Sequence, residues 1–171
     1  MPHSAAHLAN LDLTTLAERL GRLCRQQGAM VTAAESCTGG GVASAITAVA
    51  GSSDYFETGY VTYSNAAKRR LLGVPEALLE AHGAVSREVV EAMVMGACRD
   101  SGASLGVAIS GVAGPGGGSD DKPVGTVWLA WGSAEDAESE RFHYPGDRRA
   151  VRERAVREAL VGLIRRLEAN G

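Results

Sequence analysis

Two residues that can act as nucleophiles, Ser36 and Cys37, stand side by side where an apolar run gives way to two glycines. A hydroxyl or a thiol there can attack a carbonyl carbon. If a helix follows, its first backbone N–H groups have no intrahelical partner and can stabilise the resulting oxyanion. Gly39 and Gly40 allow a close approach of the backbone. The same spacing fits a helix cap formed by Ser36 or Thr38, and on spacing alone we favour the cap.

Cys37 competes with Ser36 for the role of nucleophile, because the start of a helix lowers the pKa of a thiol. Neighbouring residues on a turn point in different directions, so only one of the two can face a site. We expect Cys37 to be a small, buried packing residue.

A serine nucleophile needs a base, and the spacing of the histidines marks none. His3 and His7 lie in the N-terminal segment, His82 ends a predicted helix, and His143 lies on a predicted strand. A Ser-His-Asp triad is compatible with this distribution, but nothing in the sequence indicates one.

The better candidate for the base is Lys68, one of only two lysines among the 17 basic residues. It falls in the first turn of a helix that Asn65 is expected to cap. The helix dipole and the neighbouring arginines disfavour a cation there, and a general base needs the neutral amine. The hydroxyl of Tyr63, at the end of the preceding strand, can bridge Lys68 and Ser36. Spacing alone still favours a solvated lysine and a core tyrosine.

A glycine-rich loop at 111–122 follows a predicted buried strand, and such a loop can offer backbone N–H groups to an anion. It lacks the sequence of a P-loop, and no helix is predicted directly after it. A flexible loop fits the pattern about as well. Arg148, which opens the last predicted helix, can meet a phosphate.

The elements that carry these residues alternate between helices and strands. Apolar residues at three- and four-residue steps predict a first helix from Leu13, capped by Asp12 or Thr15 and ended by Gly28. The predicted helices are 13–27, 41–49, 66–72, 75–82, 87–100 and 148–170, and the predicted strands are 30–33, 55–64, 105–110, 124–131 and 139–144. This order predicts an α/β fold, a three-layer α/β/α sandwich with a mixed sheet.

The length of 171 residues fits one domain, and we expect a flexible tail at 1–11 and a single domain at 12–171. A net charge of −3 argues against nucleic acid as the main partner. No apolar run approaches the ~20 residues of a membrane span, and the N-terminus does not resemble a signal peptide. The three cysteines are too widely spaced to indicate a zinc site or a disulfide framework, so we expect a cytoplasmic protein.

Five strings of the sequence closely resemble the CinA C-terminal family, whose stand-alone bacterial members are nicotinamide-nucleotide amidohydrolases. The strings are 34–40, 59–65, 82–86, 109–115 and 122–127, in this order, within a similarity that runs from about residue 12 to 168. The resemblance implies hydrolysis of the carboxamide of nicotinamide mononucleotide to nicotinate mononucleotide and ammonia, in pyridine-nucleotide recycling, with no metal and no cofactor.

The resemblance also assigns residues. It implies that Ser36 is the nucleophile, Lys68 the base and Tyr63 an assisting residue. The residues expected to contact the substrate are Glu35, Thr38, Gly39, Gly40, Asn65, Gly111, Gly114, Thr126 and Arg148. Among them, we expect the amides of Gly39 and Gly40 to hold the oxyanion.

A second interpretation is a non-catalytic nucleotide-binding or regulatory module linked to competence or DNA damage, which the family name suggests. It predicts a nucleotide-shaped pocket with no lysine near Ser36. The enzyme instead requires Lys68 within hydrogen-bond reach of Ser36, directly or through Tyr63. For the assembly we expect a homodimer, the commonest symmetric oligomer.

Overall fold

The computed structural model describes residues 5–171. The helices within that range are α1 (Ala5–Ala9), α2 (Leu13–Gln27), α3 (Gly41–Thr47), α4 (Asn65–Leu72), α5 (Glu76–His82), α6 (Arg87–Ser101) and α7 (Arg148–Asn170), with a 3-10 turn η1 (Ser52–Asp54). The strands are β1 (Val31–Glu35), β2 (Phe56–Val61), β3 (Leu105–Gly111), β4 (Thr126–Gly132) and β5 (Ala137–His143).

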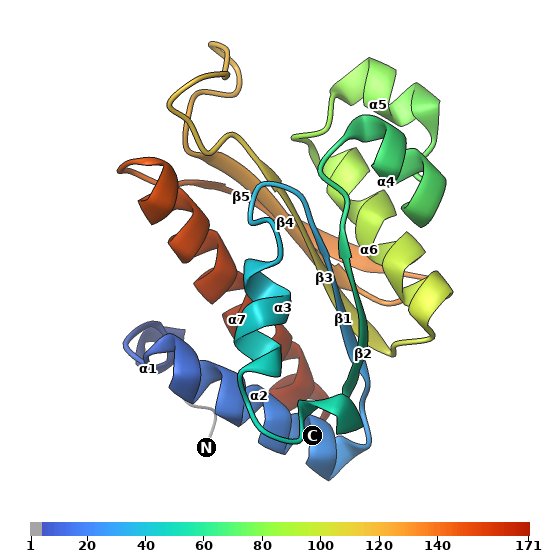
Figure 1. The fold of residues 1–171 in the computed structure, drawn as a ribbon, viewed down its shortest axis with the longest axis vertical. Helices are drawn as coiled ribbons and strands as arrows, with labels where there is room; N and C mark the ends of the chain where they lie inside the picture. Colours follow the sequence, from blue (N-terminus) through green and yellow to red (C-terminus); the bar gives the residue numbers. More distant parts are fainter. Residues whose placement is uncertain (1–4) are drawn as a thin grey trace.

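The strands form one sheet in the order β2-β1-β3-β4-β5. β1 runs parallel to β2 and β3, whereas β4 and β5 are antiparallel to their neighbours. Helices α2, α3 and α7 cover one face, and α4, α5 and α6 cover the other (Figure 1). The predicted three-layer sandwich with a mixed sheet is therefore confirmed.

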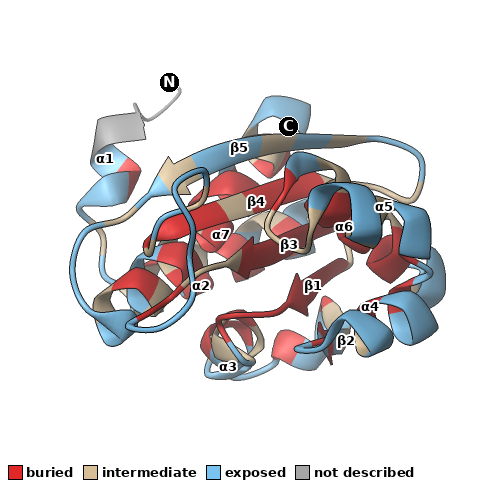
Figure 2. Cartoon of the chain, turned by 90° about the horizontal axis from the view of Figure 1, so that it is seen from above, coloured by how far each residue is buried: buried red, intermediate tan, exposed pale blue. Residues whose placement is uncertain are grey.

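The core is divided by the sheet into two clusters of buried side chains. On β1, Val31 and Ala33 belong to the cluster beneath α2, α3 and α7, whereas Ala34 belongs to the cluster beneath α6. Every residue of β1 is buried, as expected for a strand with helices on both faces. Figure 2 shows the buried interior along β1, β3 and β4, while β5 is exposed at the edge of the sheet.

The carboxyl ends of the three parallel strands meet at one edge of the sheet. Glu35, the last residue of β1, is paired with Val61 of β2 on one side and with Ile109 of β3 on the other. The segments that follow these strands therefore leave the sheet side by side. This is the edge at which open α/β sheets usually place their ligands.

Local signals at the helix ends explain most of the boundaries. The carboxylate of Asp12 accepts from the Thr15 N–H and caps α2, and Gly28 ends that helix in the left-handed region with φ 64°. The expected cap of α4 is wrong by one residue. Ser64 is the extended residue there, and its Oγ accepts from the Ala67 N–H at 3.0 Å, so Asn65 is already helical.

The N-terminal segment differs from the tail expected at 1–11. Residues 1–4, which include His3, lie outside the described residues, but Ala5–Ala9 forms α1. The side chain of Leu8 is fully buried in the core, and the Ala9 carbonyl accepts from Arg157 of α7 at 2.7 Å. Burial of this one leucine holds the segment against the domain. Across residues 5–171, no helix has the length and apolar character needed to cross a membrane.

Candidate active site

Ser36 lies directly after β1, in a turn of five residues (36–40) that precedes α3. Its N–H donates to the Ile109 carbonyl at 3.0 Å, which continues the pairing of β1 with β3 by one residue. Its carbonyl accepts from the Gly39 N–H at 3.1 Å, which closes the turn. Ser36 is therefore held by its backbone at the end of β1, and it is buried, with 8% of its surface exposed.

The ammonium or amine group of Lys68 contacts the Ser36 hydroxyl. Lys68 Nζ lies 3.0 Å from Ser36 Oγ, 2.7 Å from the Thr62 carbonyl oxygen and 3.2 Å from the Tyr63 carbonyl oxygen. A carbonyl oxygen can only accept a hydrogen bond. As an ammonium, Lys68 donates to Ser36 Oγ and to both carbonyls. As a neutral amine it can satisfy the two carbonyls with its two N–H groups, which leaves its lone pair for the Ser36 O–H. In this arrangement the amine can remove the proton of the hydroxyl.

Burial prepares Lys68 for that role. Only 1% of its surface is exposed, although it is a lysine on the short helix α4. Removal from water disfavours the cation and lowers the pKa of Lys68 to about 8, against a small opposing effect of Cys37. Roughly a tenth of the amine is then neutral at pH 7 and about half at pH 8, and the neutral form is the one that a general base requires.

Tyr63 does not bridge Lys68 and Ser36, so that expectation is wrong. Its side chain is 63% exposed, and its hydroxyl accepts from Arg148 Nη2 at 3.2 Å. What Tyr63 gives to Lys68 is its backbone carbonyl. The direct contact of lysine with serine leaves no gap for a phenol to fill.

Glu35 organises the turn that carries Ser36. Its carboxylate is buried and accepts from the Val42 N–H at 2.8 Å, the Ala43 N–H at 3.1 Å and the Thr38 hydroxyl at 2.7 Å. The N-cap residue of α3 is Gly40, which has no side chain to cap the helix. Glu35 therefore caps α3 from the end of β1 and holds the turn between them.

This arrangement corrects several expectations about the turn. The carboxylate of Glu35 and the hydroxyl of Thr38 bind each other, so both side chains face the protein rather than a substrate. The Gly39 N–H donates to the Ser36 carbonyl and is not free to hold an oxyanion. Glu35 also occupies the amides of Val42 and Ala43 in the first turn of α3, whereas the Gly40 N–H makes no hydrogen bond within residues 5–171.

We expect Glu35→Gln to destabilise the protein by about 1–3 kcal/mol, since an amide cannot accept from all three donors and one buried N–H loses its partner. Urea unfolding monitored by circular dichroism measures this. Glu57→Gln, on an exposed residue of β2, is the matched control and should change the stability by less than about 0.5 kcal/mol. Equal stabilities for the two variants would contradict the capping role of Glu35.

Cys37 is a packing residue, as expected. Its side chain is buried in the core cluster beneath α7, and a Cβ added at Gly111 would approach its Sγ to 3.2 Å. Burial raises the pKa of the Cys37 thiol to about 11, so the reactive thiolate is disfavoured.

Arg148, at the start of α7, joins two parts of the predicted site. Its Nη1 donates to the Gly114 carbonyl at 2.9 Å, and its Nη2 donates to the Tyr63 hydroxyl at 3.2 Å. The glycine-rich loop after β3 is therefore tied to the segment after β2. The guanidinium of Arg148 therefore lies between Gly114 and Tyr63, whose backbone carbonyl contacts Lys68.

Arg152 is a residue that the sequence analysis missed. Its guanidinium donates to the Cys37 carbonyl at 3.1 Å and to the Thr38 carbonyl at 3.3 Å, directly after Ser36. The one available signal was its spacing, because residues four apart on a helix share a face and Arg148 was already a candidate.

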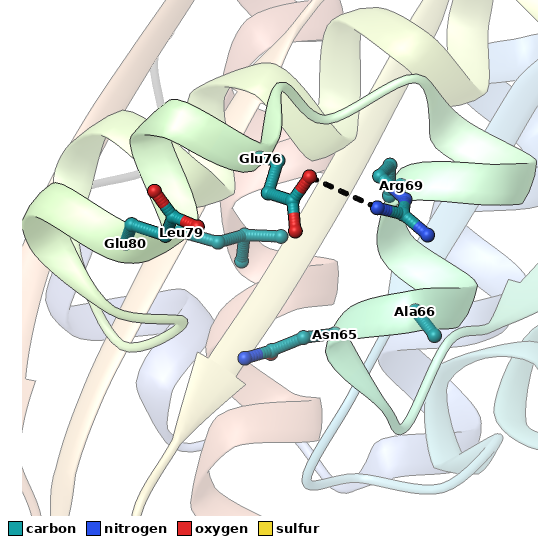
Figure 3. A pocket seen from close by; sticks show the side chains of 6 residues that line it. All are labelled: Asn65, Ala66, Arg69, Glu76, Leu79 and Glu80. Atoms are coloured by element: carbon teal, nitrogen blue, oxygen red, sulfur yellow. Dashed lines mark hydrogen bonds and ion pairs between the residues drawn. The ribbon is translucent and has the colours of Figure 1, made fainter.

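Two predicted contact residues are packed inside the protein, and a third lies in a separate hollow. Thr126 is fully buried and its hydroxyl donates to the Pro123 carbonyl, while Gly111 packs against Val127. Asn65 is exposed in a shallow hollow between α4 and α5, where Figure 3 shows Arg69 paired with Glu76. The residues that line this hollow are Asn65, Ala66, Arg69, Glu76, Leu79 and Glu80, and neither Ser36 nor Lys68 is among them.

A buried serine in contact with a buried lysine, at the carboxyl edge of an α/β sheet, defines a class of site suited to acyl transfer. Residues 13–167 match the CinA C-terminal domain, and the chain belongs to that family.

Relatives with established names agree with this assignment. The chain is 64% identical over 152 residues to the nicotinamide-nucleotide amidohydrolase PncC of Pseudomonas putida, a match that covers 89% of the chain and 95% of that protein. It is 50% identical over 157 residues to PncC of Escherichia coli K12, with 91% and 95% covered. A crystal structure of a CinA superfamily protein from Klebsiella pneumoniae superposes with a TM-score of 0.89 at 41% identity, covering 93% of this chain and 99% of that one.

Proposed function

We propose that this protein is a nicotinamide-nucleotide amidohydrolase in which Ser36 is the nucleophile and Lys68 its base. The observation that carries the proposal is the 3.0 Å contact of Lys68 Nζ with Ser36 Oγ, made by a buried lysine whose other two contacts are backbone carbonyls. The identity to relatives named for this activity supplies the substrate, nicotinamide mononucleotide.

In the first step, Lys68 takes the proton of the Ser36 hydroxyl as Oγ bonds to the carboxamide carbon. The carbonyl oxygen becomes an oxyanion in a tetrahedral intermediate. The ammonium of Lys68 then gives its proton to the amide nitrogen. The C–N bond breaks, ammonia leaves, and a nicotinoyl ester remains on Ser36.

In the second step, water attacks the ester carbon while Lys68 takes a proton from that water. A second tetrahedral intermediate collapses, the bond to Oγ breaks, and Ser36 recovers its proton. The products are nicotinate mononucleotide and the free enzyme. Lys68 thus acts as base and then as acid in each half of the reaction, which requires a pKa near the working pH.

We assign the phosphate of the nucleotide to the wall formed by Arg148 and the loop at Gly114. A guanidinium and the backbone N–H groups of a glycine-rich loop are both suited to a phosphate. The 2.9 Å contact of Arg148 Nη1 with the Gly114 carbonyl supports this assignment, because it brings the guanidinium to the glycine-rich loop.

The contact of Lys68 with Ser36 supports this proposal over the non-catalytic regulatory module. A binding module has no need to bury a lysine against a serine, and removing its charge from water is costly. The homodimer stays a prediction of the sequence.

We expect the protein to release ammonia from nicotinamide mononucleotide, with kcat/KM for nicotinamide riboside lower by at least about tenfold, because a charge-assisted contact to the phosphate contributes roughly 1.5–3 kcal/mol. A coupled ammonia assay on the two substrates and on nicotinamide measures this. Absence of ammonia from all three would reject the amidohydrolase, and equal rates for the nucleotide and the riboside would reject the phosphate wall.

A further inference from the structure

Arg152 holds the turn after Ser36 from the opposite side to Lys68. Its Nε donates to the Cys37 carbonyl and its Nη2 donates to the Thr38 carbonyl, so that one guanidinium spans two successive peptide groups. Arg152 is half-buried on α7, whereas Cys37 and Thr38 are buried. No ion pair joins Arg152 to an acidic side chain within residues 5–171, so its described contacts are to the turn.

Fixing these carbonyls also fixes the amides that belong to the same peptide planes. In a trans peptide the C=O of one residue and the N–H of the next point in opposite directions. The Cys37 carbonyl points at Arg152, so the Thr38 N–H points away from it. The Ser36 carbonyl points into the turn at the Gly39 N–H, so the Cys37 N–H points out of the turn.

The amides of Cys37 and Thr38 are therefore oriented by the turn. Within residues 36–43, the amides of Cys37, Thr38 and Gly40 donate no hydrogen bond to another residue in the described part of the chain, whereas those of Ser36, Gly39, Gly41, Val42 and Ala43 all do. Buried N–H groups without a partner are rare in proteins. Two successive ones directly after a nucleophile form a small concavity for an anion.

We propose that the N–H groups of Cys37 and Thr38 hold the oxyanion and that Arg152 is the positioning residue that orients them. The inference rests on the proposed amidohydrolase function. By donating to the Cys37 carbonyl, the guanidinium also polarises that peptide group and strengthens the Thr38 N–H as a donor. Arg152 acts through the turn and does not touch the substrate.

The position of Arg152 on α7 connects this role to the phosphate wall. Arg148 and Arg152 are four residues apart and share a face of the helix. Arg148 contacts the loop at Gly114, and Arg152 contacts the turn at Cys37. One helix therefore supports the two ends of the site, where the proposed reaction places the phosphate and the oxyanion.

The experiment compares Arg152→Gln and Arg152→Lys with Arg165→Gln, which removes an exposed arginine from the same helix. Ammonia release from nicotinamide mononucleotide gives kcat, KM and the pH profile for each. We expect Arg152→Gln to lower kcat by about tenfold to a hundredfold, a smaller loss than removal of an oxyanion donor itself. KM should stay within about twofold and the midpoint of the pH profile should not move, because Lys68 and the nucleotide wall are intact. Arg152→Lys, which can still donate to one carbonyl, should recover part of kcat, and Arg165→Gln should match the wild type.

If Arg152→Gln raises KM and leaves kcat unchanged, the proposal is overturned, and Arg152 instead binds the nucleotide directly. An unchanged kcat in a folded Arg152→Gln protein would overturn it as well. If circular dichroism shows that Arg152→Gln is unfolded, Arg152→Lys becomes the test. A wild-type kcat in Arg152→Lys, beside the lost stability of Arg152→Gln, would then show that Arg152 has only a structural role. A wild-type protein that releases no ammonia would reject the proposed function itself, which is a different result from an active wild type with an active Arg152→Gln.

Discussion

Replacing Ser36 with alanine should lower kcat for ammonia release from nicotinamide mononucleotide by at least about 10³-fold while leaving the fold intact. The substitution removes the one oxygen that Lys68 Nζ contacts outside the backbone carbonyls. The turn does not depend on that hydroxyl, because it is held by the Ser36 backbone and by Glu35. Loss of the nucleophile should therefore appear in kcat and not in the unfolding midpoint.

The control for this experiment is Cys37→Ala. The thiol is buried in the core, with its pKa raised to about 11, so its loss should leave kcat within a few fold. The cost should be one of packing, on the order of 1 kcal/mol of unfolding free energy for the lost sulfur. An inactive Cys37→Ala beside an active Ser36→Ala would reverse the assignment of the nucleophile.

Hydroxylamine gives an independent test of the ester on Ser36. A nicotinoyl ester partitions between water and a stronger nucleophile, so nicotinohydroxamate mononucleotide should form from the wild type at the expense of nicotinate mononucleotide. Ser36→Ala should form neither. Direct attack of water on the amide, with no ester, would give no hydroxamate above the uncatalysed background.

Local signals in the sequence were sufficient for the layers of the fold. Periodic apolar residues, Asp12 before α2 and Gly28 after it fix elements within a few residues, and they do so through contacts inside a single segment. The one-residue error at Ser64 has the same origin, because Ser64 and Asn65 are both good caps.

The lowered pKa of Lys68 could be predicted from the sequence, but not its main cause. The sequence pointed to the helix dipole and to the neighbouring arginines, whereas burial is the main cause of its lowered pKa. Burial depends on how α4 packs on α6 and on the end of β2, and no spacing within 64–73 reports that packing.

Contacts between residues far apart in the sequence could not be predicted from the sequence. Arg152 donates to the Cys37 carbonyl although the two residues are more than a hundred positions apart in the sequence. The carboxylate of Glu35 accepts from the first amides of α3, because the N-cap residue of that helix is a glycine without a side chain. The phenol of Tyr63 was placed toward Lys68 because the two are close in sequence. In the structure the Tyr63 hydroxyl instead accepts from Arg148, which lies near it because α7 packs against this part of the sheet.

Replacing Lys68 with methionine should lower kcat/KM by about 10²–10⁴-fold, the usual contribution of a general base. In the wild type, kcat/KM should rise with pH and level off above about 8, because only the neutral amine can take the Ser36 proton. Lys68→Arg, which keeps a charge that cannot be neutralised in this range, should be inactive at every pH. A wild-type profile that is flat between pH 6 and 9.5 would contradict the role of Lys68.

The same lysine should make the stability of the protein depend on alkaline pH. The pKa of Lys68 is about 8 when folded and 10.5 in its ordinary state, so between these values the unfolded chain binds the proton and the native protein does not. Unfolding free energy then rises with pH across that window, and below about pH 8 the native protein carries the full cost of a buried cation. Methionine does not titrate. The urea midpoint of the wild type should therefore rise relative to that of Lys68→Met between pH 8 and 10. A constant difference between the two midpoints over that range would show that the amine of Lys68 is not buried as a neutral group, and the proposed base would then have lost its physical basis.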